Sequence, residues 1–184
     1  MATASKTFSS EDDRPIKVFF EDEGRFGRMD RPYYCWAAPG VRPVVYSQIV
    51  REYTHAFSAI CPHDGDCFSL VLPYADSEAM KIFLKELSKE YSAYRVILVM
   101  DKAAWHKSKS LGEFENIRVV FQPAYSPEVN PVEHLWEYLR ENYFKNRPWR
   151  SMEALEEALC AALNDLLKIK SILQSLAGFH WAIV

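Results

Sequence analysis

The sequence predicts an α/β domain in which helices flank a mixed β-sheet. Short strand-like runs separated by turn residues fill the part of the chain up to Leu72. A helical pattern between Ser77 and Tyr91 then separates them from a second apolar strand, Arg95–Met100. A strand, a helix and another apolar strand in this order are typical of a crossover connection, which makes neighbouring strands parallel.

The first half of the chain is predicted to be an antiparallel meander with short turns. Gly24 and Gly27 are expected to mark the turn after the first strand, because glycine readily adopts turn conformations. Pro39 and Gly40 interrupt a later run in the same way. The predicted strands are Ile16–Glu21, Tyr33–Ala37, Arg42–Ser47, Thr54–Ile60 and Phe68–Leu72.

The second half supplies the helices and two further strands, Arg95–Met100 and Ile117–Phe121. Asp76 or Ser77 is expected to cap the first helix, and Ser151 caps the last one. Both helices carry apolar residues at helical spacing, so each has one face for the core. These faces are Met80, Phe83, Leu84, Leu87 and Tyr91, then Leu155, Ala158, Leu159, Ala162, Leu163 and Leu166.

The most informative stretch is Gln122–Tyr138, which reads Q-P-A-Y-S-P-E-V-N-P-V-E-H-L-W-E-Y. Its prolines bracket a tight turn, and Asn130 and Pro131 are suited to the N-cap and the first helical position. Glu133 then lies in the first turn of a helix with one apolar face. A capping box would explain Glu133, and so would a catalytic role; the two are not exclusive.

Three carboxylates are predicted to meet at one edge of the sheet. Asp22 and Asp101 each follow an apolar strand, and Glu133 lies on the nearby helix. If the two strands are adjacent and parallel, their ends lie about 4.8 Å apart. Mg²⁺ prefers oxygen ligands, and two ions can hold the attacking and leaving oxygens of a phosphoryl transfer. Two Mg²⁺ or Mn²⁺ ions are therefore the expected cofactors.

Several of these acids have competing interpretations. Glu21 and Glu23 are alternatives to Asp22, although Glu21 should point to the opposite face of the strand. Asp101 could belong to an ordinary turn. Cys61, His63 and Cys67 have a spacing that could suggest zinc. It is not a standard zinc motif, and His63–Asp66 is better explained as a hairpin turn.

Composition narrows the possible classes of protein. No apolar run approaches the roughly 18 residues that cross a membrane. Residues 1–15 have no signal-peptide pattern and are expected to be a disordered lead-in to one domain, residues 16–184. Four scattered cysteines favour a reducing compartment, which predicts a cytoplasmic location. The net charge is −3, so any charge that binds nucleic acid must be local or supplied by another domain.

Three motifs together resemble the catalytic core of DDE transposases, in the bacterial insertion-sequence branch of the mariner-type superfamily. They are F-F-E-D-E-G-R-F-G, V-M-D-K-A-A-W-H-K-S and P-A-Y-S-P-E-V-N-P-V-E-H-L-W. The resemblance runs from about Lys17 to Arg147. It implies a ribonuclease-H-like domain with a five-stranded sheet of order 3-2-1-4-5 and a catalytic, metal-binding triad of Asp22, Asp101 and Glu133.

The same resemblance implies metal-dependent DNA cleavage and strand transfer at the ends of an insertion sequence. DNA, helix-turn-helix modules that are encoded separately or missing, and a second copy in the DNA complex are the implied partners. Many relatives have Asn where this chain has Lys102. A stand-alone ribonuclease-H-like nuclease and a decayed or domesticated domain that only binds partners are the alternatives. Nucleic-acid contacts are expected from Lys102, His106, Lys107, Tyr125 and Asn130.

Overall fold

A computed structural model of the chain describes residues 8–9, 11–29, 33–102, 114–123 and 129–183. Five strands form one sheet in the order β3-β2-β1-β4-β5, which confirms the predicted mixed sheet and its order. The first three strands pair antiparallel, and β4 and β5 extend the sheet in parallel with β1. The strands are β1 (Ile16–Met29), β2 (Ile49–Ile60), β3 (Cys67–Leu72), β4 (Arg95–Met100) and β5 (Ile117–Phe121).

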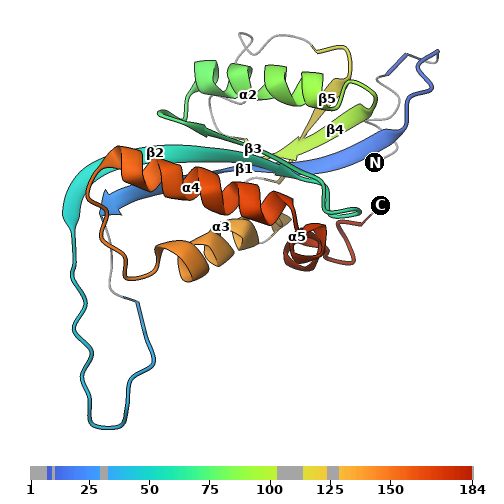
Figure 1. Cartoon of the computed structure of the whole chain (residues 1–184). Coiled ribbons are helices and arrows are strands. Elements are labelled where there is room, and N and C mark those ends of the chain that lie inside the picture. Colours follow the sequence, from blue (N-terminus) through green and yellow to red (C-terminus); the bar gives the residue numbers. More distant parts are fainter. Residues whose placement is uncertain (1–7, 10, 30–32, 103–113, 124–128, 184) are drawn as a thin grey trace.

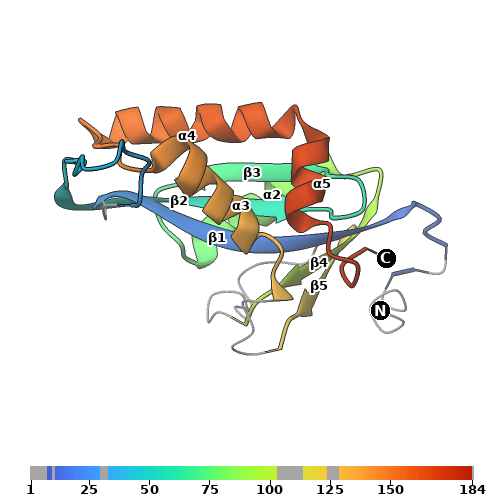
Figure 2. The same ribbon diagram turned by 90° about the horizontal axis from the view of Figure 1, so that it is seen from below.

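Helices cover both faces of this sheet (Figures 1 and 2). One face packs against α2 (Ser77–Glu90), and the other packs against α3 (Glu133–Leu139), α4 (Met152–Leu167) and α5 (Lys170–Ala177). A π-helical turn, η4 (Arg140–Phe144), continues α3. Successive residues of β1 point to opposite faces, so Phe19 joins the core beneath α2 and Phe20 joins the core on the opposite face.

The first strand is longer than the sequence predicted. β1 runs straight through Gly24 and Gly27, so the predicted turn at these glycines is wrong. A Cβ atom at Gly24 would lie 2.6 Å from Cδ2 of Trp136, and one at Gly27 would collide with the ring of Tyr53. Glycine is required here because two aromatic rings pack directly on the strand backbone.

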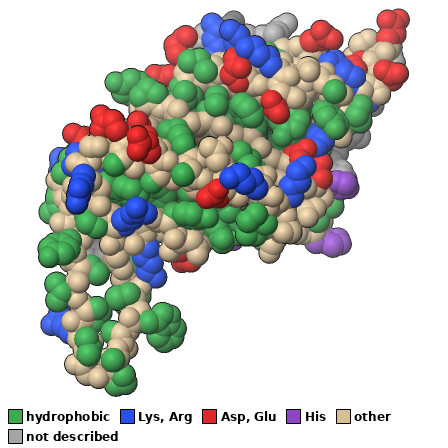
Figure 3. All heavy atoms as spheres, in the orientation of Figure 1, with side chains coloured by type: hydrophobic (Ala, Val, Ile, Leu, Met, Phe, Trp, Pro, Cys, Tyr) green, Lys and Arg blue, Asp and Glu red, His purple; other side chains and the backbone are tan. Residues whose placement is uncertain are grey.

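Residues 33–48 form an extended arm that projects from the sheet, and they are not the two predicted strands (Figure 1). The turn at Pro39 and Gly40 does form: the Val41 N–H donates to the Ala38 carbonyl at 3.0 Å, and Gly40 has a φ of +81°. The β-favouring residues of the arm have no neighbouring strand to pair with in the described structure, and several stay exposed (Figure 3). These exposed residues include Tyr34, Trp36, Val44 and Tyr46.

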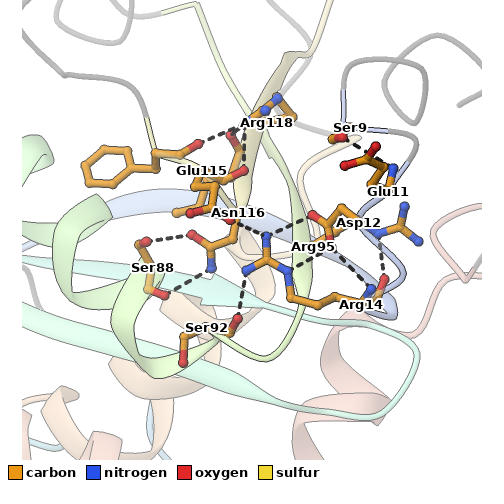
Figure 4. Close-up of polar contacts among 12 residues, drawn as sticks. Ser9, Glu11, Asp12, Arg14, Ser88, Ser92, Arg95, Glu115, Asn116 and Arg118 are labelled. Atoms are coloured by element: carbon orange, nitrogen blue, oxygen red, sulfur yellow. Dashed lines mark hydrogen bonds and ion pairs between the residues drawn. The ribbon is translucent and has the colours of Figure 1, made fainter.

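The described part of the N-terminal lead-in packs against the start of β4 (Figure 4). The Arg95 Nε–H donates to the Arg14 carbonyl at 2.6 Å, and the Arg14 guanidinium pairs with Asp12 at 2.8 Å. Phe8 is buried beneath the guanidinium of Arg118, which lies 4.7 Å from the ring centre. Residues 1–7 and 10 lie outside the described residues.

The caps of α2 and α4 agree with the sequence, and one further helix was not predicted. Asp76 and Ser151 accept hydrogen bonds from the first-turn N–H groups of α2 and α4. The unpredicted α5 is attached through Lys170, which pairs with Asp66 in the predicted His63–Asp66 turn. Lys17 of β1 pairs with the same carboxylate, so this turn connects the sheet to α5. No helix in the described ranges is long and apolar enough to cross a membrane.

We expect Gly24→Ala to lower the free energy of unfolding by about 1–3 kcal/mol, because the added methyl group overlaps Trp136. Urea unfolding of this variant and of Lys81→Ala, on the exposed face of α2, measures the effect. Equal urea midpoints for Gly24→Ala and the wild type would contradict the close contact.

Candidate active site

Asp22 and Asp101 each lie two residues beyond Phe20 and Val99, the last residues that pair between the adjacent strands β1 and β4. The parallel pairing of β1 with β4 runs from Ile16 opposite Arg95 to Phe20 opposite Val99. Two residues further along each strand are Asp22 and Asp101, and adjacent strands lie about 4.8 Å apart. Asp101 directly follows β4, as predicted. Asp22 lies inside β1, so the expectation that it ends its strand is wrong.

Asn130 joins the start of α3 to β1. Its Nδ2–H donates to the Glu21 carbonyl at 3.1 Å, and its Oδ1 accepts from the Val132 N–H at 3.2 Å. The helix begins at Glu133, two residues later than predicted, with Val132 at the N-cap. Asn130 is buried with its side chain bound to protein backbone, so it has a structural role in place of the expected contact with nucleic acid.

Trp136 contacts the first carboxylate directly. Its indole Nε1–H donates to Oδ2 of Asp22 at 2.7 Å. The indole is 1% exposed, so Trp136 belongs to the core. The sequence pattern does not predict this hydrogen bond. Chemistry could have indicated it, because a buried indole N–H needs a hydrogen-bond acceptor and Asp22 was expected beside this helix.

The charges of Asp22 and Glu133 interact. The pKa of Asp22 is raised from 3.8 to about 7, first by burial and second by the Glu133 carboxylate, while the hydrogen bond from Trp136 lowers it. Glu133 itself is half-buried in the first turn of α3. A bound cation would relieve this repulsion, because it favours the charged form of both acids.

Glu21 is less suited than Asp22 to bind a cation, because it is more deeply buried. Glu21 is 1% exposed, and neither of its carboxylate oxygens has a hydrogen-bond partner in the described structure. Burial, followed by repulsion from Glu23, Asp22 and Asp101, raises the pKa of Glu21 well above its usual range. A carboxyl group that stays protonated is a poor cation ligand, and this supports Asp22 as the ligand on β1.

The donor set suits a hard divalent cation, but it is not a closed cage. In the described ranges, no three His, Cys, Asp or Glu side chains are gathered closely enough to hold a metal ion. Mg²⁺ is usually held by one or two carboxylates together with waters and substrate phosphate, so Asp22, Asp101 and Glu133 fit it without such a cage.

The cysteines do not fit zinc. Burial is the main cause that raises the pKa of Cys61 to about 11 and that of Cys67 to about 12. In the described ranges, Cys61, His63 and Cys67 belong to no group of three side chains gathered closely enough to hold a metal ion.

The remaining predicted site residues divide into two groups. Lys102 is exposed and follows Asp101 directly, so it lies beside the carboxylates. His106, Lys107 and Tyr125 lie outside the described residues.

Comparison with known proteins was made for both the sequence and the fold. Residues 17–156 match the family model described as DDE superfamily endonuclease. The chain is 35% identical over 131 residues to the uncharacterized protein y4pE/y4sA of Sinorhizobium fredii, covering 71% of this chain and 97% of that protein. It is 32% identical over 141 residues to the insertion element IS630 uncharacterized 39 kDa protein of Shigella sonnei, covering 73% of this chain and 41% of that protein.

A more distant relative and a solved structure extend the comparison. The transposable element Tc3 transposase of Caenorhabditis elegans is 24% identical over 177 residues, covering 87% of this chain and 53% of the transposase. The Mos1 mariner paired-end complex with Mn has a similar fold, with a TM-score of 0.62 at 16% identity over 87% of this chain and 53% of that one. The chain thus spans about half or less of the IS630, Tc3 and Mos1 proteins.

The pKa of Asp22 predicts how stability changes with pH in EDTA. Asp22 holds its proton more tightly in the folded state, so the free energy of unfolding should fall as pH rises from about 4 to about 7. The part due to Asp22 is about 4 kcal/mol. We expect Asp22→Asn to flatten this slope and to be the more stable protein at pH 8. Urea unfolding between pH 4 and pH 8 measures the effect.

The matched control for this pH series is Glu137→Gln, which removes an exposed carboxylate from α3. It should keep the wild-type slope. The same slope in Asp22→Asn as in wild type would show that Asp22 is not the buried, repelled acid described above.

Proposed function

The chain belongs to the DDE superfamily of endonucleases, and from this premise we propose that it is a transposase catalytic domain. It hydrolyses DNA phosphodiesters at insertion-sequence ends. The freed 3′-hydroxyl then attacks a phosphodiester of the target DNA, which joins the two strands and releases a 3′-hydroxyl of the target. One observation carries this proposal. Asp22 and Asp101 lie two residues beyond the last pair of the adjacent parallel strands β1 and β4, and Glu133 is close enough to raise the pKa of Asp22.

The three acids would bind the metal ions, and two neighbouring residues position them. Asp22, Asp101 and Glu133 would hold one or two Mg²⁺ or Mn²⁺ ions, which supply charge stabilisation and an activated hydroxyl when bound. Trp136 keeps the Asp22 carboxylate in one orientation through its hydrogen bond. Asn130 fixes the start of α3 against β1 and so sets the position of Glu133.

In the described part of the chain, the sheet has a free edge beside the carboxylates. β4 ends at Met100, whereas β1 continues to Met29 and pairs there with β2. The carboxylates therefore lie where β1 becomes an edge of the sheet in the described structure. Lys102 is exposed beside this edge, and we propose that it pairs with a phosphate group of the DNA.

The relatives support a larger working assembly. The Tc3 relative is named a transposase, and the Mos1 structure is named a paired-end complex with Mn. Since this chain covers about half of each, we propose that helix-turn-helix modules outside these 184 residues recognise the DNA ends, and that two copies act together on them. The proposed location is the bacterial cytoplasm, with chromosomal or plasmid DNA as the substrate.

Two other functions remain as alternatives to test. A stand-alone nuclease would use the same acids but release hydrolysed DNA with no joined product. A decayed or domesticated domain would bind partners without catalysis, and the presence of acids at all three positions argues against it.

We expect Asp22→Asn, Asp101→Asn and Glu133→Gln each to slow DNA cleavage in Mg²⁺ at least about a hundredfold. That loss corresponds to about 2.7 kcal/mol of activation free energy. Labelled insertion-sequence ends and a target plasmid, with the end-recognition modules supplied, allow cleaved and joined products to be measured on the same gel. Joined product supports strand transfer, and cleavage alone supports the nuclease.

The control for the triad is Glu137→Gln, which should cleave as the wild type does. Excess Mn²⁺ should also raise the melting temperature of the wild type, because a ligand that binds only the folded state stabilises it by mass action. Near-normal cleavage by Asp101→Asn, or an unchanged Mn²⁺ shift in that variant, would remove Asp101 from the site.

DNA binding by the 184-residue chain alone should be weak and salt-sensitive, because its net charge is −3. Phosphate contacts release counterions, so the dissociation constant should rise steeply between about 50 and 200 mM salt. Fluorescence anisotropy with insertion-end and scrambled duplexes measures this. Tight binding that distinguishes the two duplexes would contradict the need for separate recognition modules.

A further inference from the structure

A cavity of about 480 Å³ opens beside Glu133. It lies along the second half of β1, next to α3 and η4, and reaches Tyr33 and Gln48 at the two ends of the arm. Glu133 and Arg140 both line it, and they are seven residues apart, about 10 Å along a helix axis. The cavity therefore continues from the carboxylates along the edge of the sheet.

The cavity is basic although the chain is acidic. Its lining contains four arginines and two glutamates, whereas the whole chain has 22 basic and 25 acidic residues. The local positive charge that the sequence could not locate is therefore beside the carboxylates. The four arginines are Arg25, Arg28, Arg140 and Arg147.

In the described structure, three of these arginines form no ion pair with a carboxylate. Arg28 binds Glu52 at 2.6 Å and the Trp149 carbonyl at 3.1 Å, so it is structural. The guanidiniums of Arg25, Arg140 and Arg147 lie over aromatic rings, with carbon-to-centroid distances of 4.6, 5.5 and 4.4 Å. Within the described residues, none of these three guanidinium groups takes part in an ion pair or a hydrogen bond.

Guanidinium groups and aromatic rings together match the two parts of a nucleotide. Arginine binds phosphate with two parallel hydrogen bonds, and aromatic rings stack on nucleobases of any sequence. Tyr33 is 43% exposed, so its ring has surface available in the lining, whereas the Tyr53 ring lies against Gly27 and the Arg25 guanidinium. The guanidinium planes stacked on the cavity rings offer a second type of stacking surface.

The size of the cavity selects one nucleotide over a duplex. A volume of about 480 Å³ corresponds to a cube with an edge of about 8 Å, which is narrower than the roughly 12 Å major groove alone. It falls within the usual range for a small-molecule site, about 300–1,000 Å³. An unpaired nucleotide fits this space, and paired DNA does not.

We propose that this cavity is a subsite for one unpaired nucleotide of the DNA strand next to the scissile phosphate. Arg25, Arg140 and Arg147 bind its phosphates, and the aromatic lining stacks on its base. The inference rests on the proposed endonuclease function, because it takes Glu133 as the boundary between the reacting phosphate and the subsite. It adds a preference for frayed or single-stranded ends.

The test compares two DNA probes on the 184-residue chain in EDTA, where no cleavage occurs. One is a fluorescein-labelled hairpin with a two-nucleotide single-stranded 3′ tail, and the other is the same hairpin with a blunt end. We expect the wild type to bind the tailed hairpin about tenfold more tightly. In Arg25→Gln and Arg140→Gln this ratio should fall towards one.

Lys81→Gln is the matched control, because it removes one positive charge from the exposed face of α2 on the other side of the sheet. It should keep the tenfold ratio. A ratio of one in the wild type, or an unchanged ratio in both arginine variants, would overturn the subsite.

Photocrosslinking gives a measurement that does not depend on variants. A tail that carries 5-iododeoxyuridine should crosslink, on irradiation, to a peptide that contains Tyr33 or Tyr53. Crosslinks confined to other peptides would also overturn the proposal.

The two proposals fail in different ways. A wild type that prefers the tailed hairpin but cleaves no DNA in Mn²⁺ keeps the subsite and overturns the endonuclease function. A wild type that cleaves DNA but has no preference for the tail keeps the function and overturns the subsite.

Discussion

The hydrogen bond from Trp136 to Asp22 is the contact around which the candidate active site is organised. Hydrogen bonds to charged groups contribute about 1.5–3 kcal/mol. Making this one requires the indole to lie directly on β1, and that is possible only because residue 24 is glycine. Asn130 adds a second link between β1 and the start of α3. Together these contacts place Glu133 beside Asp22 without any direct bond between the two acids.

This arrangement keeps an unfavourable charge pair inside a stable fold. Asp22 is partly buried and repelled by Glu133, so its ionised form destabilises the metal-free protein. The surrounding structure tolerates that cost because two separate cores, one on each face of the sheet, hold the strands in place. A bound cation would relieve this repulsion between the two carboxylates. The same residues therefore destabilise the metal-free protein and favour cation binding.

The charge distribution also bears on the proposal that this acidic chain binds DNA. A whole-molecule charge of −3 would repel a polyanion, yet the basic groups that matter lie in one cavity beside the acids. Arg25 comes from β1, Arg140 from η4, and Arg147 from the segment before α4. Their aromatic neighbours hold the guanidiniums in place without neutralising them. Positive charge is thus available locally while the remaining surface stays mixed.

The sequence alone determined the features that depend on local pattern. Apolar runs located β3, β4 and β5, cap residues located α2 and α4, and the three motifs predicted the sheet order and the acids of the candidate site. Tertiary structure decided the rest. Glycine is typical of turns, but Gly24 lies within β1 and allows Trp136 to pack closely on it. The residues of the arm favour strands but have no neighbouring strand in the described structure. The Trp136–Asp22 bond joins residues 114 positions apart, and no local pattern encodes such a distance.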